Sequence, residues 1–144
     1  EAIVAADLAN QPQVFAIDLA WEPHLGRGDD RRRFDADWER WVIEQYGSVE
    51  HAEAVIGRPL WRRDGRLSGP PDEELASDGD HRTAVAVYRR FVDDLASRHY
   101  GRARRFLRGL GCRQLLTART GYGGTGSHWA DPHMPLDPAA PRTS

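Results

Sequence analysis

The sequence contains no lysine, only one cysteine and no long apolar run. A single cysteine, Cys112, excludes a disulfide within the chain and any zinc site built from several cysteines. No apolar segment approaches the roughly 20 residues that a membrane-spanning helix needs. All 20 basic residues are arginines, and 22 acidic residues offset them to a net charge of -2. The chain therefore lacks the basic excess that is typical of nucleic-acid-binding proteins.

Tryptophan is abundant instead, with five in 144 residues, a length that fits one domain. A tryptophan side chain carries a large apolar surface that is costly to leave exposed. Trp38 and Trp41 fall on the apolar side of a predicted helix, so we expect them to pack in a core. Trp61 falls in a predicted loop and is the better candidate for a platform under a sugar ring.

The order of predicted elements is helix, strand, helices and strand, which is the order that a parallel α/β sheet or barrel requires. Gly101 is a candidate break in the longest helix, and Gly111 is a candidate C-cap for it. The elements are a helix end over 1–10, a strand over 14–20, helices over 34–46 and 48–57, a long loop over 58–79, a helix over 80–110 and a strand over 113–120.

The first strand alternates in a way that fits a barrel strand. Phe15, Ile17 and Leu19 form a bulky face for outer helices, and Ala16 and its even-numbered neighbours form a smaller face for a crowded interior. Glu22 continues the series of the smaller face, two residues past Ala20, and lies where the strand ends. In barrel enzymes the carboxyl ends of the strands build the active site.

Three segments resemble one enzyme family. Residues 15–23 (FAIDLAWEP) resemble the fourth-strand segment of clan A of the retaining glycoside hydrolases, where the acid/base glutamate sits in an Asn-Glu-Pro motif. Residues 34–52, with paired tryptophans and a Tyr-Gly-Ser, are similar to the stretch that follows in the β-galactosidase branch (family 42). Residues 88–95 resemble the next helix of that branch.

This resemblance implies an α/β fold, a partial (β/α)8 TIM barrel covering about the fourth and fifth β/α units. Residues 1–144 are then a single partial catalytic domain, an internal fragment of a glycosidase that cleaves β-linked sugars with retention. Glu22 is the implied general acid/base. The implied nucleophile comes from the seventh strand, outside this chain, so the chain alone is expected to be inactive. An oligo- or polysaccharide is the implied partner, with no metal or organic cofactor.

One position departs from the family pattern, because Trp21 stands where the family has the asparagine that bonds the sugar 2-hydroxyl. The substrate-binding candidates are Trp21, His24, Arg119 and Tyr122. If His24 does not contact the substrate, it is expected to be a solvated loop residue. If Arg119 does not contact the substrate, it is expected to pair with an aspartate. A cellulase-like or mannanase-like subgroup, a non-catalytic carbohydrate-binding barrel protein and a small independent domain remain open as alternatives.

Two further patterns have simpler interpretations. Residues 121–126 (GYGGTG) match the GxGxxG dinucleotide motif, but that motif must open a helix, and the proline-rich segment after it predicts none. A flexible loop is the preferred interpretation. His128, Asp131 and His133 carry metal-binding groups without a recognised spacing, which favours a polar loop.

Overall fold

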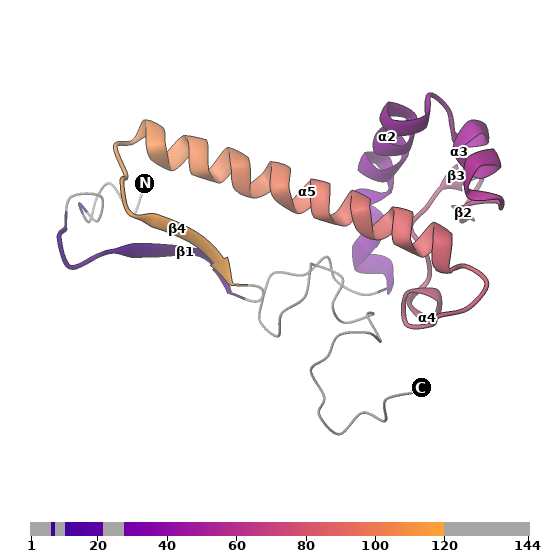
Figure 1. The fold of residues 1–144 in the computed structure, drawn as a ribbon, viewed down its shortest axis with the longest axis horizontal. Coiled ribbons are helices and arrows are strands. Elements are labelled where there is room, and N and C mark those ends of the chain that lie inside the picture. Colours follow the sequence, from indigo (N-terminus) through magenta and orange to yellow (C-terminus); the bar gives the residue numbers. More distant parts are fainter. Residues whose placement is uncertain (1–6, 8–10, 22–27, 120–144) are drawn as a thin grey trace, which may run out of the picture.

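The computed structural model describes residues 7, 11–21 and 28–119, and for residues 20, 21, 118 and 119 it describes the backbone alone. Figure 1 shows one long helix that connects a two-stranded sheet to a cluster of shorter elements. The elements are β1 (Ala16–Trp21), the 3-10 helix η2 (Gly28–Phe34), α2 (Asp35–Tyr46), α3 (Val49–Ile56), β2 (Arg62–Arg63), β3 (Arg66–Leu67), α4 (Asp72–Leu75), α5 (Arg82–Gly109) and β4 (Leu115–Arg119).

Strands β1 and β4 are parallel neighbours, as the order of elements predicts. Their pairing begins where the Leu115 amide donates to the Phe15 carbonyl at 2.9 Å. Helix α5 runs back along the sheet in the opposite direction, so β1, α5 and β4 form a β-α-β arrangement (Figure 1). The described residues thus have a mixed α/β fold, and the closed barrel stays a prediction.

The two faces of this sheet differ in exposure. Ile17, Leu19 and Leu116 are half-buried, whereas Asp18 and Thr117 on the other face are exposed. Among the described helices, α5 is the one that lies along the sheet (Figure 1). Phe15 on the first face is nevertheless 79 % exposed and Ala16 on the second is half-buried, so which face lies toward α5 stays a prediction.

The main core lies away from these strands, between α2, α3, the β2–β3 hairpin, α4 and the first half of α5. Trp38 is at its centre and is fully buried, with ring centroids 5.6 Å from Trp41, 5.2 Å from Tyr88 and 5.3 Å from Phe91. The expectation that Trp38 and Trp41 pack in a core is confirmed. The other buried members are Val42, Ala52, Leu60, Leu67, Leu75, Ala84, Val85, Val87, Val92 and Leu95.

The prediction of a long loop over 58–79 is wrong. This segment contains β2, β3 and α4, and its three leucines, Leu60, Leu67 and Leu75, are buried in the core. Asp64 and Gly65 both have positive φ (52° and 77°), as a two-residue hairpin turn requires. The strands are only two residues long, so no alternation is visible in the sequence, although the Asp-Gly pair signalled the turn.

The helix ends follow the predicted capping residues. The Ser48 side chain accepts a hydrogen bond of 3.1 Å from the His51 amide, which caps α3, and Gly57 ends α3 with a left-handed φ of 82°. Helix α5 is continuous through Gly101, so the expected break there does not occur. Gly111 follows its C-terminal end with a φ of 84°, as predicted.

Candidate functional site

Two of the predicted substrate-binding residues meet at the carboxyl ends of the parallel strands. Trp21 ends β1, Arg119 ends β4, and their Cα atoms are register partners. Residues this far apart in the sequence become neighbours because the crossover through α5 returns the chain to the same sheet in the same direction. The other predicted site residues, Glu22, His24 and Tyr122, lie outside the described residues.

The register of β1 against β4 shifts just before this point. Asp18 pairs with Thr117 and Trp21 with Arg119, so β1 uses three steps where β4 uses two. Such irregularities are frequent beside active sites, because an extra residue redirects the strand. The unbroken alternation that was extended from Ala16 to Glu22 therefore does not hold across this shift.

Asp18 is the single carboxylate on β1 and β4 as the structure describes them. Its negative charge, together with burial as the larger cause, raises the pKa of Tyr100 on α5. A pair of catalytic carboxylates is thus not present on these two strands. The position of a nucleophile stays a prediction.

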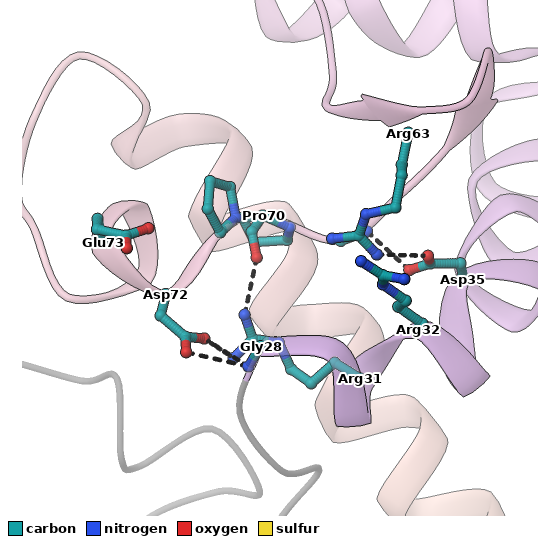
Figure 2. Close-up of a pocket in the computed structure, with 10 residues that line it drawn as sticks. Gly28, Arg31, Arg32, Asp35, Arg63, Pro70, Asp72 and Glu73 are labelled. Carbon is teal, nitrogen blue, oxygen red and sulfur yellow. Dashed lines mark hydrogen bonds and ion pairs between the residues drawn. The ribbon is translucent and has the colours of Figure 1, made fainter.

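A small pocket opens at the start of η2. It has a volume of about 150 Å³ and lies between the start of η2 and α2 on one side and residues 69–73 on the other (Figure 2). Its lining is rich in charged and polar groups. The labelled lining residues are Gly28, Arg31, Arg32, Asp35, Arg63, Pro70, Asp72 and Glu73.

Arg31 is the buried cation of this pocket, with only 7 % of its surface exposed. Its guanidinium donates to the Pro70 carbonyl at 2.9 Å and pairs with the Asp72 carboxylate at 2.5 Å. The Gly28 amide donates to the same carboxylate at 3.0 Å. A buried charge is tolerated only when it is paired in this way. Arg31 therefore ties η2 to α4.

Asp35 organises the opposite wall. Its carboxylate accepts a hydrogen bond of 3.0 Å from the Gly69 amide and lies 3.5 Å from the Arg63 guanidinium. A larger hollow of about 530 Å³ adjoins this wall and shares Arg32, Asp35 and Arg63 with the pocket. We refer to the two adjoining hollows together as the polar cleft beside α2, and its lining carries charged groups of both signs. Such a lining offers both donors and acceptors, which suits a neutral ligand rich in hydroxyl groups.

Trp61 is not among the residues that line this cleft. Its indole ring stacks on His81 with centroids 5.3 Å apart and an angle of 29° between the planes, and it packs against the core. His81 in turn lies 3.2 Å from the Glu74 carboxylate. One face of Trp61 is thus already covered by protein.

Comparison with known proteins gives no family for this chain. It matches no protein-family model, no curated protein and no solved structure. Over the ranges that the structure describes, no group of three or more His, Cys, Asp or Glu side chains is arranged to hold a metal ion. In the same part of the chain, no helix combines the length and the apolar character that crossing a membrane demands. His128, Asp131 and His133 lie outside the described residues.

Proposed function

We propose that this chain is part of a retaining glycoside hydrolase of the (β/α)8-barrel type, in which Glu22 is the general acid/base. The observation that supports it best is the parallel pairing of β1 with β4, which aligns Trp21 with Arg119. Glu22 follows Trp21 directly in the sequence. The carboxyl ends of parallel strands are where α/β sheets and barrels bind their ligands.

In this proposal Glu22 protonates the glycosidic oxygen as it leaves, and later removes a proton from the attacking water. A second carboxylate about 5 Å away forms the covalent glycosyl-enzyme intermediate. By resemblance that carboxylate is supplied from outside this chain. Trp21, His24, Arg119 and Tyr122 contact the sugar, with the indole of Trp21 in the place of the family's asparagine amide.

The polar cleft beside α2 favours an oligosaccharide, rather than a single sugar, as the substrate. The cleft begins at Gly28, six positions after Glu22, so the chain can separate the two by at most about 20 Å, a distance that an extended oligosaccharide spans. Arg32, Asp35 and Arg63 supply donors and acceptors to sugar hydroxyls, while their opposite charges balance. A charge-balanced lining does not repel a neutral ligand, which agrees with an uncharged oligosaccharide as the substrate.

The test compares Glu22→Gln with the wild type in the complete protein that carries this chain. Substrates with a poor leaving group need protonation, so we expect their hydrolysis to fall by roughly 10²- to 10⁴-fold. Activated aryl β-glycosides need no proton, so they should still release their aryl group in a first turnover. Glu50→Gln, on the exposed side of α3, is the matched control and should behave as the wild type. Unchanged hydrolysis of the natural sugar by Glu22→Gln would contradict the assignment.

The alternative is a barrel protein that binds carbohydrate without cleaving it, and Trp21 in place of asparagine is the feature that favours it. The same measurements separate the two functions. A binder retains a panel of oligosaccharides on the wild-type protein and releases no aryl group from activated glycosides. An enzyme releases the aryl group, and its turnover of substrates with poor leaving groups depends on Glu22.

A further inference from the structure

The second half of α5 has two chemically different sides. Toward the sheet, Tyr100 and Ala103 are half-buried and Leu107 is buried. On the opposite side Arg98 and Arg102 are exposed. Because an α-helix has 3.6 residues per turn, residues 98, 102 and 105 share one face, and that face points away from the sheet.

This face forms one wall of a groove whose other wall is the start of α2. The groove has a volume of about 560 Å³, and the buried Leu95 lies at its base. Four arginines line it against a single carboxylate, whereas positive and negative side chains balance in the cleft beside α2. These charged lining residues are Arg40, Arg98, Arg102, Arg105 and Asp37.

The arginines differ in how well they are paired. Arg40 lies 3.0 Å from Asp37, and Arg98 lies 3.7 Å from Glu44, with both arginine side chains at least half exposed. Exposed pairs of this kind neutralise little charge. Within residues 28–119, Arg102 and Arg105 have no ion-pair or hydrogen-bond partner. Since like charges one turn apart on a helix repel each other, an anion bound between them would relieve that repulsion.

We propose that this groove binds a ligand that carries a phosphate or sulfate ester, with Arg102 and Arg105 as its main contacts. Guanidinium groups match tetrahedral oxyanions because they donate two parallel hydrogen bonds. Residues three apart on a helix are neighbours at about 5–6 Å, so both side chains reach one anionic group. Arg40 contributes from the α2 wall of the groove and Arg98 from the α5 wall. The inference does not depend on the glycosidase proposal, because it uses no residue of the strand ends.

The experiment is isothermal titration calorimetry of the full chain at constant ionic strength. The probes are pyrophosphate, glucose 6-phosphate and glucose 6-sulfate, and the two esters distinguish phosphate from sulfate. The test variant is Arg102→Gln/Arg105→Gln. The control variant is Arg90→Gln/Arg104→Gln, which removes the same charge from exposed positions of the same helix outside the groove.

We expect pyrophosphate and at least one ester to bind the wild type and the control, and to bind the test variant at least tenfold more weakly. All four substituted positions are exposed, so both variants should keep the far-UV circular dichroism of the wild type. Equal weakening in the control would show that the net charge alone acts, and this would overturn the proposal. Binding that survives in the test variant, or no binding of any probe by the wild type, would overturn it as well.

Discussion

The indole Nε1 of Trp41 donates a hydrogen bond of 2.8 Å to the Asp94 carboxylate, which fastens α2 to α5. Trp38 stacks beside Trp41 in the same core, with ring centroids 5.6 Å apart. Unlike Trp41, it has a buried Nε1 with no hydrogen-bond partner among the described residues. The two side chains therefore have similar packing and differ in one polar contact.

This difference predicts unequal costs for the same substitution. Trp38→Phe and Trp41→Phe both remove apolar contacts from the core, so both should lower the free energy of unfolding. Trp41→Phe also removes the hydrogen bond that the Asp94 carboxylate accepts from the indole. Trp38→Phe removes an indole N–H that makes no hydrogen bond among the described residues. We expect Trp41→Phe to cost about 1 kcal/mol more. Urea denaturation of the two variants measures this, and equal costs would show that the Trp41 hydrogen bond contributes nothing.

The contact between Gly69 and Tyr88 gives a second prediction. A Cβ atom at Gly69 would lie 2.8 Å from the Tyr88 hydroxyl oxygen and 2.9 Å from the ring carbon that carries it. Tyr88 cannot retreat, because Trp38 and Phe91 pack against it. Gly69→Ala should therefore cost roughly 1–3 kcal/mol through overpacking. Its matched control is Gly79→Ala, where the nearest atom is 3.6 Å away and where the thermal midpoint should hardly change.

Burial of Tyr88 predicts a loss of stability at high pH. Burial raises the pKa of the Tyr88 hydroxyl to about 12. The positive charge of Arg31 lowers this pKa, but it offsets only part of the effect of burial. The unfolded chain ionises this group near pH 10, so between pH 10 and 12 the unfolded state binds fewer protons than the folded one. The free energy of unfolding therefore falls as the pH rises through that window and is unaffected below it.

The measurement compares the wild type with Tyr88→Phe between pH 8 and 11.5. The wild type should lose more stability across this interval, by an amount on the order of 1 kcal/mol or more. Burial and Asp18 also raise the pKa of Tyr100, but that contribution is common to both proteins and cancels in the comparison. Parallel stability curves for the two proteins would show that Tyr88 is not the group responsible.

Part of this fold could be predicted from the sequence because it depends on local signals. The alternation in residues 14–20 predicted β1, the helical spacing of apolar residues predicted α5, and Ser48 and Gly57 marked the ends of α3. Trp38 and Trp41 could be assigned to a core because they share one side of a helix. Each of these signals depends on a few neighbouring residues, so it can be recognised in the sequence without knowing the fold.

The remaining features depend on contacts between distant residues. Arg31 stands in a run of three arginines that carries no sign of burial, and only the approach of Pro70 and Asp72 makes its burial possible. The register shift before Trp21 is set by the partner strand, so no pattern within β1 reveals it. The cleft around Asp35 and Arg63 likewise joins residues from α2 and β2. The catalytic pair stays a prediction for the same reason, since the proposal for Glu22 requires a carboxylate from another strand.

The last prediction concerns how stability is distributed along the chain. Val42 and Phe91 are fully buried in the core, where α2 and the first half of α5 pack together. Strands β1 and β4 have only each other as partners in the described sheet, and Phe15 and Leu115 at their amino ends are 79 % and 67 % exposed. Elements with few buried contacts and exposed backbone hydrogen bonds open locally at a lower free energy than the core does.

Native-state hydrogen exchange should therefore divide α5 into two parts. We expect the amides of Val42 and Phe91 to exchange slowest, at the rate of global unfolding. The amides of Ile17 and Leu116 should exchange at least tenfold faster, because opening a two-stranded sheet exposes little apolar surface. Positions after Leu95 on α5 should have intermediate rates, since their sheet-facing side is only partly covered. If the strands proved as strongly protected as the core, further contacts would have to cover the sheet, in which Phe15, Asp18, Leu115 and Thr117 are exposed.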